Sequence, residues 1–186
     1  LGSASSLVAD AIGDRADLQE PFTVEGWLRR DQSAAGCLET VCGTWDGSCG
    51  WRLVIDAAGE TPAFRIQAKG GGGMTKLIAA PFAPEAVPAL DGRWHHVALS
   101  YDPKVGRGLW SLYVDGRAAG QAGNWWDPSG ARLSGYAHAF RVGSVDGDAD
   151  AVSMVGGFDC WRISSGVLAP SDFLYAHPAG LMLIYR

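Results

Sequence analysis

Short hydrophobic segments recur along the chain, separated by turn residues. Alternation of apolar and polar positions is typical of β-strands with one buried face, and short dense apolar runs are typical of strands buried on both faces. The segments cover residues 22–30, 37–45, 51–57, 63–69, 75–80, 94–102, 109–122, 140–145, 157–165 and 181–186. Glycine (26 residues) and proline (9 residues) punctuate the spaces between them. The pattern predicts an all-β sandwich of antiparallel strands.

Helical periodicity is not sustained anywhere for a dozen residues. The nearest case is SLVADAIGDRADL (6–18), whose glycine and aspartates disfavour a long helix. Asp115-Gly116 predicts a two-residue type I′ hairpin turn within 109–122, because both positions of that turn need positive φ. APSDF (169–173) predicts one helical turn before the last strand. Neither a repeat nor a linker interrupts the pattern, so we expect a single domain over residues 1–186.

Composition and charge narrow the class of protein. With 186 residues, 47% hydrophobic and 19% charged, the chain is expected to be globular and to bury roughly 70% of its unfolded surface. Apolar runs stay well short of the roughly 20 residues that span a bilayer, so we expect no membrane insertion. The net charge is −5 and the lysines are few, so we expect no nucleic-acid binding. The three lysines are Lys69, Lys76 and Lys104.

The beginning of the chain and its cysteines bear on location. The sequence starts at Leu1 and shows no basic segment followed by an apolar core, so we expect an excised piece of a larger protein. Four cysteines without a C-x-x-C pair weaken a zinc site and suit an oxidising compartment, meaning an extracellular, periplasmic or cell-surface location. Cys42 and Cys49 flank GTWDGS and could close it as a disulfide-bonded hairpin loop. The alternative is that they are small buried thiols.

Three segments in order resemble laminin-G-like domains of the concanavalin A-like lectin/glucanase superfamily. PFTVEGWLRR (21–30) resembles the opening strand, and DGRWHHVALSYDP (91–103) followed by WSLYVDGR (110–117) resembles the central strand pair. GGFDCWRISSGVLAPSDF (156–173) is similar to the late strand and short turn, although Cys160 stands where the family pattern usually has a longer acidic side chain. The resemblance implies a jelly-roll sandwich of two curved antiparallel sheets. Function varies widely within this superfamily, so the fold does not decide it.

Catalytic carboxylates are the first candidate chemistry. The superfamily's glucan hydrolases carry two glutamates and an aspartate alternating on one strand, where they share one face. No E-x-D-x-E or E-x-D-x-x-E occurs here, and the glutamates are isolated from one another. His95 and His96 with Tyr101 could serve a lyase as base and acid. Strand alternation explains them better, because it places His95 on one face with Val97 and Leu99 and His96 on the other.

Calcium is the cofactor that the sequence favours most. DGDAD (146–150) supplies Asp146, Asp148 and Asp150, and calcium takes hard oxygen ligands from such irregular loops. The resemblance adds to this, since laminin-G-like domains often bind calcium at a sandwich edge. The alternative is a solvated acidic turn, because the run lacks the full spacing of an EF-hand loop.

Tryptophans are the strongest binding signal. Trp94, Trp110 and Trp161 lie in family strands, where core packing explains them. The four tryptophans at loops or strand ends are candidate sugar platforms, because a flat indole matches the apolar C–H face of a pyranose. These four are Trp45, Trp51, Trp125 and Trp126, with Asn124 and Asp127 as possible hydroxyl partners. The alternative is that loop aromatics plug the edge of the sheet.

Trp125 and Trp126 are expected to divide their roles. Adjacent side chains in extended backbone point to opposite sides, so one indole would anchor the loop while the other faces outward. Trp27 is expected on the face opposite Phe22 and Val24, because it alternates with them along one strand.

Together these features predict a non-catalytic, lectin-like carbohydrate-binding module of a secreted glycan-acting protein. Its expected partners are a glycan or polysaccharide and the other domains of the parent protein. Two alternatives stay open. One is a protein-interaction or spacer module, and the other is a polysaccharide lyase or glycoside hydrolase.

Overall fold

The computed structural model describes residues 7–9, 18–31, 37–45, 50–57, 62–69, 80–81, 91–123, 139–144, 151–174 and 184–185. Its regular elements are nearly all strands, as the sequence predicts. They are β1 (Leu7–Ala9), β2 (Phe22–Arg30), β3 (Leu38–Gly43), β4 (Gly50–Asp56), β5 (Ala63–Lys69), β6 (Ala80–Pro81), β7 (His95–Asp102), β8 (Leu109–Val114), β9 (Arg117–Gly123), β10 (Phe140–Val142), β11 (Ala151–Ser153), β12 (Gly156–Ser165), the 3-10 turn η4 (Pro170–Asp172) and β13 (Ile184–Tyr185). Among the described residues no helix is long and apolar enough to cross a membrane.

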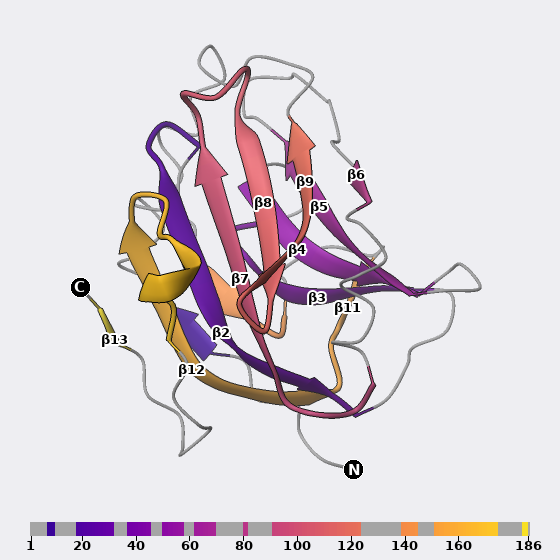
Figure 1. Ribbon diagram of the computed structural model, residues 1–186. Coiled ribbons are helices and arrows are strands. Elements are labelled where there is room, and N and C mark those ends of the chain that lie inside the picture. Colours follow the sequence, from indigo (N-terminus) through magenta and orange to yellow (C-terminus); the bar gives the residue numbers. More distant parts are fainter. Residues whose placement is uncertain are drawn as a thin grey trace.

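The strands form two sheets that lie face to face as a jelly-roll sandwich (Figure 1). The seven-stranded sheet has the order β1-β10-β3-β4-β5-β6, and β11 also pairs with β3. The six-stranded sheet has the order β13-β12-β2-β7-β8-β9. In Figure 1 the six-stranded sheet faces the viewer, with β3, β4 and β5 behind it. Pairing is antiparallel except for β11 with β3 and β13 with β12.

Turns fall where the sequence predicts them, and two short strands were not predicted. Asp115 (φ 49°) and Gly116 (φ 72°) form the hairpin turn between β8 and β9, and η4 lies within 169–173. Residues 7–9, in the stretch nearest to a helical pattern, instead form β1 against β10. Residues 151–153 form β11 beside β3. Three-residue strands are too short to show a period, so only their pairing partners reveal them.

An aromatic cluster joins the two sheets in the core. Phe22 of β2 stacks on Trp51 of β4, with ring centroids 5.3 Å apart and 28° between the planes. Trp110 of β8 lies 5.5 Å from Trp51, and Phe140 of β10 lies 6.2 Å from it. Trp110 and Trp161 are buried, as predicted for core residues. These rings bury the largest apolar surfaces of the sandwich and therefore dominate its packing energy.

A second contact between the sheets is ionic. Arg30 at the end of β2 and Glu39 near the start of β3 both point inward and are almost fully buried. The guanidinium donates from Nε to Oε2 at 2.9 Å and from Nη2 to Oε1 at 2.6 Å, a bidentate pair. Planar two-point bonding of this kind satisfies both charges without water. The isolated Glu39 of the sequence is thus a link between the sheets.

Candidate functional site

Two of the predicted sugar platforms are wrong. Trp51 is 0% exposed because β4 begins at Gly50, which places the indole inside the sandwich and not at an open strand end. Trp45 is 6% exposed, and the guanidinium of Arg52 lies 4.7 Å above its ring. Arg52 is held in place by a 2.5 Å hydrogen bond from Nε to Oε1 of Gln67. Trp45 is therefore a packing partner of Arg52, a cation–π contact, and not an exposed platform.

The structure also contradicts the predicted Cys42–Cys49 disulfide, because Cys42 has no disulfide partner. Cys42 is a free thiol, 1% exposed, on the core face of β3. Burial in this apolar core raises the pKa of the thiol, which keeps it protonated and unreactive. The remaining predicted site residues, Cys49, Asn124, Trp125, Trp126, Asp127, Asp146, Asp148 and Asp150, lie outside the described residues. Their roles, including calcium binding, stay predictions.

The outer face of the six-stranded sheet carries a buried polar network centred on Glu25. Alternation along β2 places Glu25 on the face opposite Phe22 and Val24, together with Trp27, as predicted. Arg162 of β12 binds Oε1 of Glu25, from Nε at 2.7 Å and also from Nη2. His96 of β7 donates from Nε2 to Oε2 at 3.0 Å. Three strands that neighbour one another in space, but not in sequence, thus meet at one carboxylate.

The network also ties down the segment that follows η4. The backbone N–H of Leu174 donates to Oε2 of Glu25 at 2.7 Å, and Nη2 of Arg162 donates to the carbonyl of Asp172 at 2.6 Å. Burial alone would raise the pKa of Glu25, but the hydrogen bonds from His96, Leu174 and Arg162 outweigh it and lower the pKa. Glu25 is therefore an ionised structural group, and not a carboxyl poised near neutral pH as a general acid.

A β-bulge at Cys160 brings Arg162 to this face. Asp159 pairs with Trp27 and Arg162 pairs with Glu25, so β12 has one residue more than β2 over this stretch. Cys160 takes up that residue with φ 50°, in the left-handed region that few non-glycine residues adopt. The extra residue reverses the alternation, which buries Trp161 and turns Arg162 outward. The departure from the family pattern at Cys160 thus coincides with the bulge that places the arginine.

Aromatic side chains continue from the network across the sheet. The ring of Phe173 lies 5.8 Å from that of His96 and 5.2 Å from that of Tyr113, which it meets edge-on. Phe173 is 6% exposed, because the turn at η4 folds it down onto the sheet. Tyr113, on β8, is only half-buried. The Glu25 network therefore fixes a segment whose aromatic side chain supports the ring of Tyr113.

Trp94 also lies on this outer face. The prediction that it packs in the core is therefore wrong. A Cβ on Gly157 would come within 2.6 Å of the indole, so the glycine lets Trp94 lie against the strand. The guanidinium of Arg29 lies 5.2 Å from the ring centroid. Arg29 is in turn paired with Asp31, with Nε 2.6 Å from Oδ1. The half-buried indole is covered by strand backbone and by an arginine.

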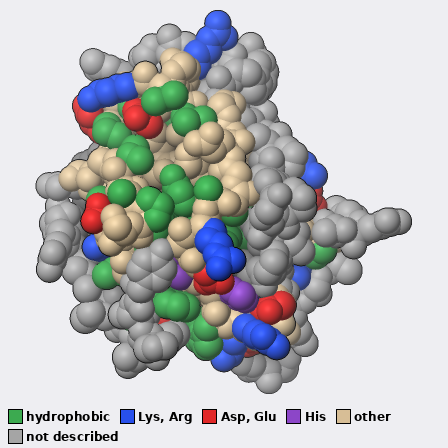
Figure 2. Space-filling view, viewed as in Figure 1, with side chains coloured by type: hydrophobic (Ala, Val, Ile, Leu, Met, Phe, Trp, Pro, Cys, Tyr) green, Lys and Arg blue, Asp and Glu red, His purple; other side chains and the backbone are tan. Residues whose placement is uncertain are grey.

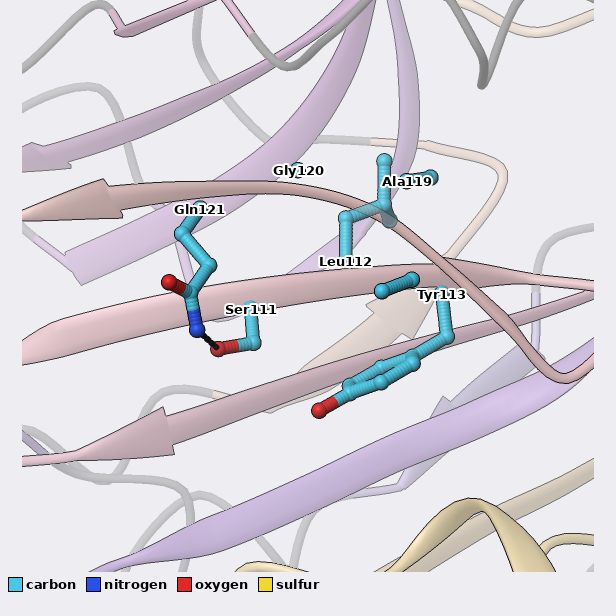
Figure 3. Close-up of a pocket in the computed structure, with 7 residues that line it drawn as sticks. Ser111, Leu112, Tyr113, Ala119, Gly120 and Gln121 are labelled. Atoms are coloured by element: carbon cyan, nitrogen blue, oxygen red, sulfur yellow. Dashed lines mark hydrogen bonds between the residues drawn. The ribbon is translucent and has the colours of Figure 1, made fainter.

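A hollow of about 340 Å³ lies on β8 and β9, beside Tyr113 (Figure 3). It is lined by Ser111, Leu112, Tyr113, Ala118, Ala119, Gly120 and Gln121. Figure 3 shows Ser111, Tyr113 and Gln121 projecting to one side of the strands and Leu112 and Ala119 to the other. The volume is at the lower end of the range for small-molecule sites, about 300–1,000 Å³. In the view of Figure 2, the area over β7, β8 and β9 consists mainly of hydrophobic side chains, backbone and uncharged polar groups.

The polar groups of the hollow are set by strand pairing. Ser111 pairs directly with Gln121, and the Gln121 amide donates from Nε2 to the Ser111 hydroxyl at 3.0 Å. Because the Ser111 hydroxyl accepts this bond, its proton and the Gln121 carbonyl oxygen can still act as one donor and one acceptor. Sequence reasoning missed all three outward residues of the hollow. The available signal was the alternation of Ser111 and Tyr113 within LWSLYV.

His95 forms a separate cluster at the start of β7. Its Nδ1 lies 2.8 Å from Oδ2 of Asp115 and its Nε2 lies 2.9 Å from Oδ1 of Asp91. Both ring nitrogens therefore face carboxylates, an arrangement that suits the imidazolium, which donates from both. Partial burial alone would lower the pKa of His95, but the hydrogen bonds to Asp115 and Asp91 outweigh it and raise the pKa. The cluster fastens the β8–β9 turn to β7.

Protonation of His95 is expected to stabilise the fold. Because the pKa of His95 is raised on folding, the stabilisation is complete below the unfolded pKa of about 6.5 and is lost as the pH rises through the folded value. We expect the free energy of unfolding of the wild type to fall over this range relative to that of His95→Gln. Urea unfolding of both proteins between about pH 6 and 9 measures the difference. Parallel pH profiles would contradict the assignment.

Comparison with known proteins places this fold. Residues 3–172, nearly the whole chain, match a laminin-G family model of the concanavalin A-like lectin/glucanases superfamily. The chain belongs to this superfamily. The laminin-G-like resemblance of its three motifs is thereby confirmed. A search of curated protein sequences finds no significant relative.

Solved structures share the concanavalin A-like sandwich at low sequence identity. The Ruminococcus gnavus IT-sialidase CBM40 bound to α2,3 sialyllactose has 13% identity and a TM-score of 0.64, with 92% of this chain and 91% of that chain covered. The binding domain of botulinum neurotoxin serotype D has 14% identity and a TM-score of 0.60, with 92% of this chain and 39% of that chain covered. NanB with Optactamide has 13% identity and a TM-score of 0.65, with 91% of this chain and 26% of that chain covered. At these identities the likeness concerns the fold alone.

Proposed function

We propose that this chain is a non-catalytic carbohydrate-binding module and that the hollow on β8 and β9 is its binding surface. The observation that carries the proposal is the Ser111–Gln121 pair beside the Tyr113 ring. A sugar is recognised by such a combination, because its hydroxyls need donors and acceptors while its C–H face packs on an aromatic ring.

The carboxylates support a binding role more than a catalytic one. A glycoside hydrolase needs two carboxyl groups about 5–9.5 Å apart across the scissile bond. The two buried glutamates of the described part are each occupied by an arginine, Glu25 by Arg162 and Glu39 by Arg30. The structural neighbour solved with sialyllactose offers a precedent for glycan binding on this fold. We further propose that the module serves a secreted glycan-acting protein.

The tryptophan pair of the sequence fits into this proposal. Asn124 follows Gly123, the last residue of β9, directly in sequence. The four residues from Gln121 to Trp125 can span at most about 14 Å. We propose that one of Trp125 and Trp126 adds a second aromatic surface to the hollow, with Asn124 and Asp127 as polar partners.

A glycan array followed by titration calorimetry tests the function. We expect binding to at least one glycan, weakened about tenfold or more by Tyr113→Ala through loss of the stacking ring. Tyr113→Phe is the matched control, because it keeps the ring and should keep most of the affinity. Trp125→Ala and Trp126→Ala are measured in parallel, and one of them is expected to weaken binding. The absence of binding to any glycan would refute the proposal.

A further inference from the structure

We propose that the hollow on β8 and β9 selects an uncharged sugar ring and discriminates against sugars that carry a carboxylate. The inference rests on the proposed function and names its ligand class. It is carried by the lining of the hollow, where the described side chains are a serine, a tyrosine, a glutamine and small or aliphatic residues. None of the seven lining residues is charged.

A carboxylate on the ligand would lose water in the hollow without gaining a charged partner. Burying an unpaired anion is costly, and proteins that bind carboxylates usually supply arginine or lysine for this reason. Two arginines that the structure describes on this face are already engaged. Arg162 is bound to Glu25 and to the Asp172 carbonyl, and Arg29 is paired with Asp31.

Strand alternation also keeps the arginine of β9 away from the hollow. Ala118 pairs with Tyr113 and lines the hollow, whereas its neighbour Arg117 pairs with Val114. Side chains of adjacent residues in a strand point to opposite faces, so Arg117 lies on the side of the strand away from Tyr113. The described lining of the hollow therefore combines uncharged side chains with polar groups that suit hydroxyls.

The small residues of β9 shape the floor for a flat ring. The register of β8 with β9 shifts by one residue between Leu112 and Tyr113, which makes Ala119 the extra residue of a bulge. Ala119 is 3% exposed, with its methyl group directed into the core. The β9 residues Ala118, Ala119 and Gly120 all line the hollow, and none carries a side chain larger than a methyl group. A pyranose can thus approach the backbone, with Tyr113 on one side and Gln121 on the other.

The experiment compares matched neutral and acidic glycans on the whole chain. Lactose and α2,3 sialyllactose differ by one acidic sugar, and unsubstituted xylan and glucuronic-acid-substituted xylan form a second pair. The strongest neutral ligand of the glycan array is added to the series. We expect the neutral member of each bound pair to bind more tightly than the acidic member, and equal affinities would overturn the ligand class. Gln121→Ala is expected to weaken neutral binding about tenfold through loss of one hydrogen-bonding group.

Two variants on the same strand sharpen the test. Gln121→Arg puts a guanidinium into the hollow and is expected to shift preference toward the acidic member of the pair. Arg117→Ala is the control, since it removes a charge from the opposite side of β9 and should leave both affinities unchanged.

The outcomes separate the two levels of the proposal. Neutral binding that depends on Gln121 and exceeds acidic binding supports both the function and the ligand class. Tight acidic binding that is lost in Gln121→Ala overturns the ligand class and leaves the function standing. Neutral binding that is indifferent to Gln121→Ala and Gln121→Arg overturns the assignment to this hollow. Failure to bind any glycan overturns the proposed function itself.

Discussion

Replacing Glu25 with alanine is expected to lower the free energy of unfolding by about 3–5 kcal/mol, because the change leaves a buried guanidinium without its partner. Glu25 is 0% exposed, and the side chain of Arg162 is 12% exposed. His96 and the N–H of Leu174 lose their acceptor in the same change. Urea unfolding at neutral pH measures the loss, and the near-ultraviolet signal reports whether the 170–174 segment stays docked.

An exposed ion pair provides the matched comparison. Asp31 also binds an arginine, Arg29, but both side chains are well exposed, at 43% and 38%. Water screens such a pair, so Asp31→Ala is expected to change stability little. A loss in Asp31→Ala as large as that in Glu25→Ala would contradict the structural role assigned to the buried network.

The Glu25 network also predicts that the free energy of unfolding depends on pH in the acidic range. Because the pKa of Glu25 is lowered on folding, its contribution is present above the unfolded pKa of about 4.3 and is lost as the pH falls through the folded value. The difference in unfolding free energy between wild type and Glu25→Gln should therefore shrink below about pH 4. A difference that stays constant down to pH 2 would show that the ionised form is not what the network stabilises.

Replacing Trp51 with alanine is the second change with a large expected effect. Deleting a fully buried tryptophan costs about 3–5 kcal/mol, through lost apolar burial and the cavity that remains. Trp51 bridges the sheets, stacked on Phe22 and near Trp110 and Phe140. Urea unfolding of Trp51→Ala and Trp51→Phe measures the effect, and the phenylalanine variant should lose less because a ring remains.

A measurement of glycan binding distinguishes the core-packing role of Trp51 from the sugar-platform role that the sequence predicts. The folded fraction of Trp51→Phe is expected to bind with the affinity of the wild type, because Trp51 is shielded from ligands. Loss of binding at unchanged stability would instead make Trp51 part of a ligand site.

The sequence predicts this fold well where local signals are strong. Alternation along 22–30 and 95–101 separates Phe22 and Val24 from Trp27, and Val97 and Leu99 from His96, because both strands are long and regular. Asp115-Gly116 predicts its hairpin turn, since the turn chemistry is local. Trp51 shares its core face with Leu53 and Ile55, but its place at the start of the predicted segment 51–57 suggests an open strand end. Strand ends are the least certain feature of a period-two pattern.

The site was harder to predict because it depends on pairing and on bulges. Ser111 and Gln121 meet only through the register of β8 with β9, and the bulge at Ala119 breaks the alternation that would reveal the outward residues. Glu25 meets Arg162 at a sequence separation of 137 residues, through a second bulge at Cys160. A single sequence carries no local signal for either meeting.

The position of β2 within its sheet bears on how the chain folds. β2 lies between β7 and β12, and its pairing with β12 joins Phe22 to Ser165 and Arg30 to Gly156. One edge of β2 therefore stays unpaired until β12, near the end of the chain, is available to pair with it. Contacts of such long sequence separation slow folding, because the entropy of closing the loop is lost before the contacts repay it. During synthesis strand 22–30 is therefore expected to present a bare hydrogen-bonding edge, a hazard for edge-to-edge association, until residues 156–165 emerge.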